Sequence, residues 1–174
     1  MLRKMAANKE MLITRITGGV LLITLLFIAS PAAAPYQETA RCIRVIDGDT
    51  IDLSNDKRVR YIGVNSPPIK KADAITCVLG EKAKAYNENL VLNKTVRLIF
   101  DVQPEDKYGR FLAYVYVGDI FVNAELVREG YASASKHPPN VRYAEFFKGL
   151  EDEAKEGRQG LWSIVERVRY QPQE

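Results

Sequence analysis

Hydrophobic and polar positions alternate along several short segments of the chain. Three such segments in the first half are rich in β-branched side chains and span residues 41–46, 50–53 and 58–64. Alternation with a period of two places successive side chains on opposite faces of a strand, so each segment is predicted to be a half-buried β-strand. Further segments of this kind span residues 95–100, 111–117 and 120–122. The pattern therefore predicts about five principal strands.

Three other stretches repeat their apolar residues every three or four positions, as an amphipathic helix does. They span residues 80–92, 124–129 and 141–156. Asn123 precedes the second stretch as a predicted N-cap, and Gly130 and Gly157 end the second and third. With one helix inserted between the third and fourth strands, this order predicts an α+β fold, a small Greek-key barrel with helices.

The first 34 residues have a different composition. A basic start is followed by an apolar run over residues 16–29 and then by small residues ending at Ala34. This order is typical of a secretory signal peptide, and cleavage after Ala34 would leave Pro35 as the first residue. The alternative is an uncleaved membrane anchor, because the run approaches the roughly 20 residues that a spanning helix needs. The chain is thus divided into a leader (1–34), a folded domain (35–164) and a charged tail (165–174).

The net charge of the whole chain does not by itself predict a nucleic-acid partner. The formal charge is +3, but the leader holds four of the 25 basic residues and one of the 22 acidic ones. The remainder of the chain is therefore electrically neutral. Any binding of phosphate must depend on a local arrangement of charges.

The two cysteines, Cys42 and Cys77, leave two interpretations open. In an exported protein they could form a disulfide, or they could be two separate small hydrophobic side chains. Because there is one histidine in the chain, His137, a zinc site is not indicated. His137 stands beside two prolines and is interpreted as an exposed loop residue.

The first candidate site is the Asp-Gly-Asp-Thr segment at residues 47–50, between the first two predicted strands. Such a segment often forms only a tight turn. The next strand, however, carries arginine and ends in a polar Asn-Ser-Pro segment at 65–67. A meander of three strands would bring these groups together, where oxygen ligands suit Ca²⁺ and a guanidinium suits phosphate.

A second candidate segment spans residues 106–110 and precedes the strand that begins at Phe111. Loops of mixed charge are usually only solvated, but Arg110 stands next to a strand that would hold it rigidly. Two arginines on separate strands could clamp a phosphodiester and stabilise the extra negative charge of its transition state.

These motifs, in this order, resemble the staphylococcal nuclease (thermonuclease) family. The likeness runs from Cys42 to Trp162 and is carried by residues 45–50, 59–67, 106–114, 122–130 and 160–162. The resemblance implies an OB-fold, a five-stranded Greek-key β-barrel with three helices. It also implies calcium-dependent cleavage of DNA and RNA. By position, it assigns Asp49, Asn65 and Ser66 to the metal, Arg60 and Arg110 to catalysis at the phosphate, and Lys107 and Tyr108 to a terminal phosphate of the substrate.

Two positions depart from the family pattern. The family commonly has aspartate where this chain has Asn65, and its general-base glutamate corresponds to Pro68. Proline cannot accept a proton, and general-base assistance is worth roughly 10²–10⁴ in rate. The acids next in sequence, Asp73 and Glu81, have no predicted place in the site. The aromatic residue that the family stacks on a base also has no match near residues 135–137.

The sequence therefore predicts a monomeric, exported nuclease with impaired activity, acting on DNA or RNA with Ca²⁺ and without a protein partner. One alternative is a catalytically inactive OB-fold module that binds nucleic acid or nucleotides. Another is an envelope protein that uses the barrel as a scaffold for interactions. A membrane association is expected only if the leader is not cleaved.

Overall fold

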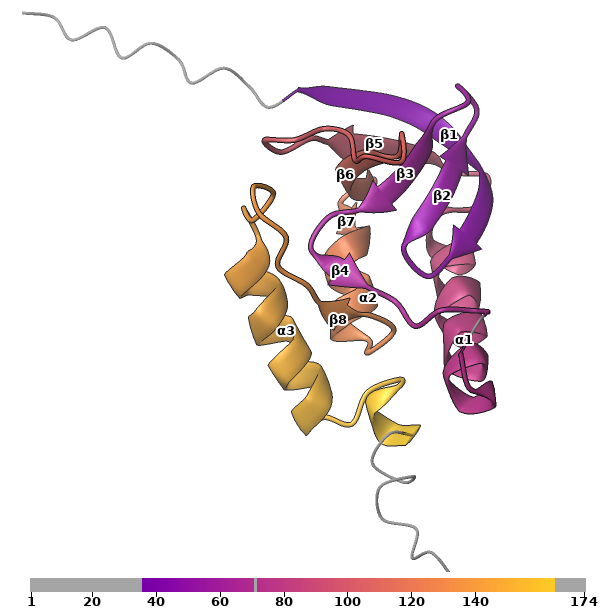
Figure 1. Cartoon of the computed structure of the whole chain (residues 1–174), viewed down its shortest axis with the longest axis vertical. Helices are drawn as coiled ribbons and strands as arrows, with labels where there is room; N and C mark the ends of the chain where they lie inside the picture. The colour runs from indigo at the N-terminus through magenta and orange to yellow at the C-terminus, as the bar shows by residue number, and fades with distance from the viewer. Residues whose placement is uncertain (1–35, 71, 165–174) are drawn as a thin grey trace, which may run out of the picture. The chain divides into compact units, whose positions relative to one another are not determined.

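Five strands close into a barrel in the computed structural model, which describes residues 36–70 and 72–164. The strands are β1 (Gln37–Asp47), β2 (Thr50–Leu53), β3 (Arg58–Tyr61), β5 (Thr95–Ile99) and β6 (Phe111–Val117). They follow one another in the order β3-β2-β1-β5-β6, and a parallel pairing between β3 and β6 closes the ring (Figure 1). A short strand, β7 (Ile120–Phe121), pairs antiparallel with the end of β6. The predicted leader and tail lie outside the described residues.

Three helices within the described residues pack around the barrel. They are α1 (Ala74–Val91), α2 (Val122–Arg128) and α3 (Ala144–Glu156). Helix α1 contacts β1, while α2 contacts both β6 and α3 (Figure 1). No helix within residues 36–70 and 72–164 combines the length and the hydropathy needed to span a membrane. This arrangement confirms the predicted α+β fold, a five-stranded barrel with three helices.

The core fills the barrel and the space between it and the helices. Its largest fully buried side chains include Tyr61, Tyr114 and Phe147. The hydroxyl of Tyr61 donates to Oδ1 of the buried Asn87 on α1 at 3.0 Å, so its burial leaves no polar group unsatisfied. Leu161 is also buried, so the segment after α3 packs back onto the domain. The strands that carry the candidate residues thus belong to one rigid core.

The first strand is longer than predicted, because it begins at Gln37 rather than at residue 41. Residues 37–41 pair with β5, whereas the second half of β1 pairs with β2. The first half is largely polar, with no alternation to reveal it in the sequence. Its backbone pairing with β5, rather than a buried face, makes it a strand.

The third predicted strand, residues 58–64, is interrupted. It ends at Tyr61, and after Gly63 the chain forms β4 (Val64–Asn65), which pairs with β8 (Ser133–Ala134). Gly63 has a positive φ of 78°, and a Cβ there would lie 2.5 Å from the Phe147 ring. The bend thus requires glycine and turns Asn65 away from the barrel sheet.

The helix boundaries also differ from the prediction. Helix α1 begins six residues earlier than residue 80, because Asp73 caps it by accepting a hydrogen bond from the Thr76 amide at 3.0 Å. Asn123 is not an N-cap. It lies buried inside α2, where its side chain accepts from the Val115 amide at 2.9 Å and donates to the Ile62 carbonyl at 2.8 Å. Helix α3 begins at residue 144 rather than 141, after a turn.

The two cysteines are free thiols. Cys42 is fully buried in β1, and Cys77 is partly exposed on α1. The structure therefore supports the interpretation that Cys42 and Cys77 are two separate side chains and not a disulfide.

Candidate active site

The turn between β1 and β2 brings three segments of the chain into contact at Gly48. A Cβ on Gly48 would lie 2.6 Å from the Ser66 Cβ and 2.8 Å from the Ala83 Cβ of α1. Only glycine allows the turn to approach so closely. The Asp47 carboxylate accepts from the Asp49 amide at 3.1 Å and fixes the turn. The sequence therefore directs the Asp49 side chain inward.

Asp49 is buried, with 4 % of its surface exposed, and it contacts the segment that follows β4. Its Oδ2 accepts from the Ser66 amide at 2.6 Å, and its Oδ1 lies 3.1 Å from Nε of Arg60. Burial raises the pKa of Asp49 to about 6, although the Arg60 guanidinium opposes this shift. The carboxylate is thus a negative charge that its surroundings compensate only in part.

Arg60 connects Asp49 with Asn65. Its Nη1 donates to the carbonyls of Tyr61 and Val64, both at 2.8 Å, and its Nη2 donates to Oδ1 of Asn65 at 3.1 Å. With Nε paired to Asp49, one of the five guanidinium N–H groups has no partner among the described residues. The guanidinium is therefore held firmly and offers little further bonding capacity.

The three residues assigned to the metal are neighbours, since Asp49 contacts Ser66 directly and reaches Asn65 through Arg60. Their oxygens are of the kind that a hard cation such as Ca²⁺ prefers. Only Asp49 is charged, however, and the described part of the chain contains no group of three His, Cys, Asp or Glu side chains that could hold a metal. A cation would share Asp49 and Asn65 with Arg60. The donor set fits a weakly held hard cation.

Pro68, at the position of the family's general base, is exposed and its backbone is fixed against α1. A Cβ on Gly80 would lie 2.4 Å from the Pro68 carbonyl oxygen, so glycine permits this contact. The later acids do not replace the missing base. Asp73 accepts bonds from the Thr76 amide and hydroxyl at the start of α1, and Glu81 is an exposed residue of that helix.

The second candidate segment forms a tight loop organised by Asp106. One carboxylate oxygen of Asp106 accepts from the amides of Tyr108 (2.8 Å) and Arg110 (3.0 Å), and the other pairs with the Arg110 guanidinium at 2.7 Å. Gly109 supplies the positive φ of 76° that closes the loop. Arg110 directly precedes β6, which pairs in register with β3, so both candidate arginines belong to the seam that closes the barrel.

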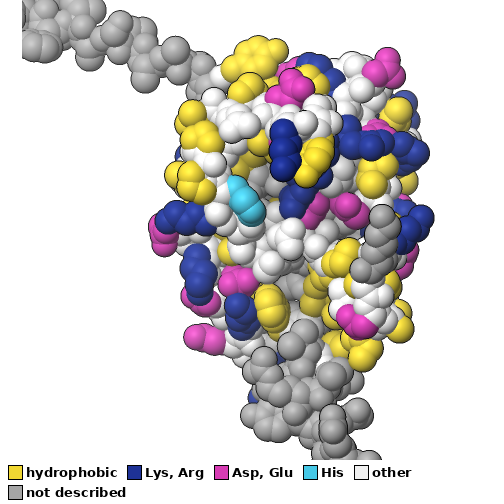
Figure 2. Space-filling view, viewed as in Figure 1, with side chains coloured by type: hydrophobic (Ala, Val, Ile, Leu, Met, Phe, Trp, Pro, Cys, Tyr) yellow, Lys and Arg dark blue, Asp and Glu magenta, His cyan; other side chains and the backbone are white. Residues whose placement is uncertain are grey.

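One pocket of about 280 Å³ receives both arginines. Its lining includes Arg60 and Ile62 from β3 and the segment after it, and Lys107, Tyr108 and Arg110 from the loop before β6. Basic side chains gather on this face, beside the single histidine (Figure 2). The structure thus brings together the four residues predicted to contact the substrate, while Asp49, Asn65 and Ser66 adjoin the pocket through Arg60.

His137 lines the same pocket, together with Pro138, Pro139 and Asn140. It is exposed, as predicted, but its loop is held in place. The Ser135 Oγ lies 2.9 Å from Nδ1 of His137, and the Asn140 side chain exchanges two hydrogen bonds with the backbone of Gln103, at 2.7 and 2.8 Å. Sequence reasoning missed this placement. The only signal was the position of His137 in the loop where the family carries its base-stacking aromatic residue.

Comparisons with known proteins agree with this geometry. The sequence model of the family described as "Staphylococcal nuclease homologue" matches residues 58–164. The chain is 35 % identical over 164 residues to the thermonuclease of Staphylococcus intermedius, which covers 85 % of this chain and 98 % of that protein. It is 36 % identical to the thermonuclease of Staphylococcus hyicus, covering 73 % of this chain and 77 % of that protein. It is 42 % identical to the endonuclease YncB of Bacillus subtilis, over 69 % of this chain and 59 % of that protein. With its barrel, its paired arginines and these relatives, the chain belongs to the staphylococcal nuclease family.

Proposed function

We propose that the protein is a nuclease that hydrolyses phosphodiester bonds of DNA or RNA, slowly and with the assistance of Ca²⁺. The observation that supports this most is the pocket into which Arg60, on β3, and Arg110, directly before β6, both open, since these two strands pair in register. Two guanidinium groups on rigid supports suit a phosphodiester whose negative charge grows in the transition state. The names of the relatives support the same class of reaction.

The two arginines would contribute unequally. Arg110 pairs through Nε and Nη2 with Asp106 and keeps its remaining N–H groups for a ligand, whereas Arg60 keeps one. We therefore expect Arg110 to provide most of the contact with the phosphate. Arg60 would add one hydrogen bond and positive charge. Lys107 and Tyr108, both exposed at the pocket wall, would contact a terminal phosphate of the same substrate.

Ca²⁺ would be held by oxygens of Asp49, Asn65 and Ser66 and would supply positive charge beside the phosphate. A single carboxylate among these residues predicts weak binding. No carboxylate stands at position 68 to take a proton from water. Slow cleavage is the expected result.

The leader, the domain and the tail would have separate roles. Residues 1–34 would direct export and be removed, with membrane anchoring as the alternative if they are retained. Residues 35–164 would form the nuclease domain, acting on nucleic acid as a monomer without a protein partner. Residues 165–174 would be a charged tail.

The second candidate function is a module that binds nucleic acid or nucleotides without cleaving them. Pro68 and Asn65 are the observations that favour it, because they remove the proton acceptor and one ligand charge and leave the arginines in place. The barrel and pocket suit binding alone equally well.

One experiment separates these functions. The purified full-length chain is incubated with single-stranded DNA in Ca²⁺ or in chelator, and binding of thymidine 3′,5′-bisphosphate is titrated in parallel. We expect slow cleavage that needs Ca²⁺, and an Arg110→Ala variant that binds the bisphosphate roughly ten- to a hundredfold more weakly. The control is Arg97→Ala, because Arg97 lies over the Tyr116 ring and does not line the pocket.

Binding that depends on Arg110, in the absence of any cleavage, would support the binding module. If wild type and Arg110→Ala bound the bisphosphate equally, or neither bound it, the pocket would not be a phosphate site and both functions would be wrong.

A further inference from the structure

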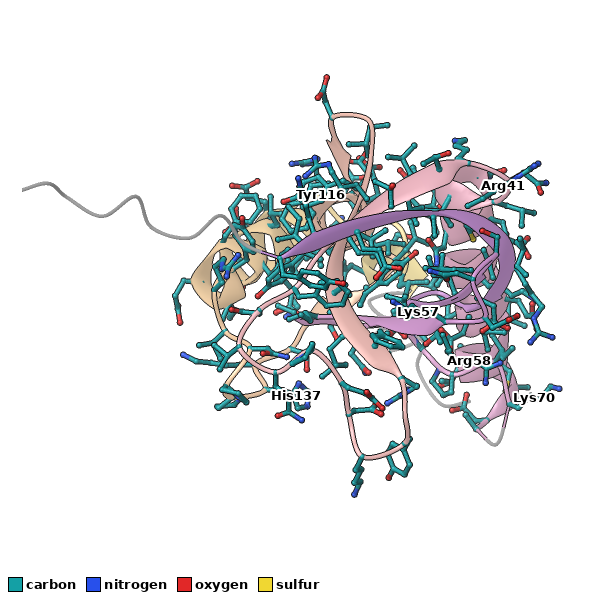
Figure 3. All side chains as sticks on the ribbon, turned by 90° about the horizontal axis from the view of Figure 1, so that it is seen from above. Arg41, Lys57, Arg58, Lys70, Tyr116 and His137 are labelled. Atoms are coloured by element: carbon teal, nitrogen blue, oxygen red, sulfur yellow. The ribbon has the colours of Figure 1, made fainter. Side chains whose placement is uncertain are left out.

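A second hollow, of about 470 Å³, lies next to the pocket that receives the two arginines. Tyr108 and Arg110 line both spaces, so the loop before β6 forms the wall between them. Figure 3 shows this loop projecting from the barrel between His137 and Arg58, which belong to the first and the second space respectively. The two spaces are therefore consecutive along one face of the molecule.

An irregularity in β1 directs an apolar side chain into the second hollow. Cys42 pairs with Leu53 and Arg44 pairs with Asp52, so Ile43 is an extra residue between two successive pairs, a β-bulge. Ile43 lines the hollow and keeps 53 % of its surface exposed. Bulges commonly redirect side chains next to functional sites. Burial in the core does not account for this isoleucine.

The lining of the hollow also includes an exposed aromatic ring. Tyr108 is 72 % exposed, with the Lys107 Nζ 5.0 Å and the Arg110 Cζ 5.6 Å from its ring centroid. These cations and the hydrogen bond of its amide to Asp106 restrain the loop that presents the ring. An exposed aromatic ring with cations beside it is the usual platform on which a base of single-stranded nucleic acid stacks.

Asp52, a carboxylate of the hollow, fixes the guanidinium groups of Arg58, which lines the hollow, and of Arg44, which does not. Arg58 donates to this carboxylate through Nε at 2.7 Å and Nη2 at 3.1 Å, and Arg44 donates to it through Nε at 2.9 Å. These bonds hold the pKa of Asp52 below its usual value. One carboxylate thus fixes two guanidinium groups, whose other N–H groups remain able to bind an anion.

From this arrangement we infer that the second hollow binds a further nucleotide of the same single strand whose phosphate lies between Arg60 and Arg110. The base of this nucleotide packs between Ile43 and the Tyr108 ring. Its phosphate lies beside Arg58 and Arg110, the two basic side chains of the lining, and away from the negative charge of Asp56, which also lines the hollow. The inference rests on the proposed function and specifies the substrate as a strand of several nucleotides rather than a single one.

The test compares a short ligand with a long one on the full-length chain. Thymidine 3′,5′-bisphosphate fills the first pocket only, and a thymidine hexanucleotide with phosphorothioate linkages reaches both. Ile43→Ser and Arg58→Gln should each weaken binding of the hexanucleotide by about five- to twentyfold. Their affinity for the bisphosphate should stay within about twofold of wild type, which also shows that the variants are folded.

Two variants outside both spaces serve as matched controls. Ile120→Ser removes an isoleucine of similar exposure on β7, and Arg97→Gln removes an arginine on β5. Both should bind the two ligands as wild type does.

If Ile43→Ser and Arg58→Gln bound the hexanucleotide as tightly as wild type, the second subsite would be wrong while the first pocket stood. The subsite would equally be wrong if wild type bound the hexanucleotide no more tightly than the bisphosphate. If wild type bound neither ligand, the proposed function would fail and the subsite with it.

Discussion

Arg60, which we propose binds the phosphate, also has a structural role. The Arg60 guanidinium connects Asp49, the carbonyls of Tyr61 and Val64 and the Asn65 amide in one unit. Asn65 can serve this unit as well as aspartate, because a neutral amide oxygen accepts the same hydrogen bond. The cost falls on cation binding, to which an amide contributes no charge. The departure at Asn65 thus preserves the geometry and weakens the electrostatics.

The variant with both Asn65→Asp and Pro68→Glu should cleave single-stranded DNA faster than wild type. The first change would strengthen cation binding. The second would supply a proton acceptor and would raise the cleavage rate by roughly 10²-fold or more if the new side chain pointed into the site. A modest gain is expected, because the backbone at position 68 is packed against Gly80 and limits where the new side chain can point. The measurement is the initial cleavage rate at saturating Ca²⁺. If wild type already cleaved fast and the double variant were no faster, another group would activate the water.

Cys42 gives the protein a defined response to alkaline pH. Burial raises the pKa of its thiol from 9.0 to about 11, so between these values the unfolded chain loses a proton that the folded chain keeps. The contribution of Cys42 to stability is therefore intact below pH 9 and declines as the pH rises toward 11, by about 1–3 kcal/mol.

The comparison that isolates this effect is Cys42→Ala. The difference in free energy of unfolding between wild type and the variant should be constant up to pH 9 and should shrink above it, measured by urea denaturation. A difference that stays constant to pH 11 would mean that the thiolate is accommodated in the folded barrel.

At the scale of elements, the turn between β1 and β2 depends on a single missing methyl group. Gly48→Ala should lower the free energy of unfolding by about 1–3 kcal/mol, because its Cβ would overlap Ser66 and Ala83. It should also weaken binding of the bisphosphate, since the turn, Ser66 and Arg60 are connected through Asp49.

Gly149→Ala is the matched control, because Gly149 lies exposed in α3 with no atom within 4 Å of the added Cβ. That variant should be slightly more stable than wild type. Urea denaturation measures both. If Gly48→Ala were as stable as wild type, the turn would be able to move away from Ser66 and Ala83 without loss of stability.

Local patterns predicted the elements where one face of a strand or helix is buried, as in β5 and α3, and they failed where tertiary contacts decide. The first half of β1 is polar and is a strand because β5 lies beside it. Asn123 has the residue type of an N-cap, but hydrogen bonds to Val115 and Ile62, which are distant in sequence, place it inside α2. The place of His137 in the pocket likewise depends on Asn140 and Gln103, which no local pattern connects.

For the candidate site, the sequence predicted which residues would lie together but not how they are bonded. The motifs identified which residues would gather, because the order of strands in a barrel fixes which turns meet. They could not show that Arg60 uses most of its donors within the protein. They also gave no indication of the bulge at Ile43, since a bulge is defined by pairing between two strands.

For the molecule as a whole, the leader predicts a mature chain that begins near Pro35. The small residues Ala32 and Ala34 are of the kind that signal-peptide cleavage requires. Mass spectrometry of protein from a secreting host should show this N-terminus. A membrane-bound species that retains residues 1–34 would identify the leader as an anchor instead.

The parallel seam between β3 and β6 has a consequence for how activity returns when the protein refolds. Val59 pairs with Phe111 across this seam, so Arg60 and Arg110 become neighbours only through a contact between distant parts of the chain. Contacts of such long range must overcome a large loop-closure entropy and tend to form late. Intermediates with an open barrel would contain both arginines but no phosphate clamp. Recovery of ligand binding during refolding should therefore follow the slowest structural phase and report complete closure of the ring.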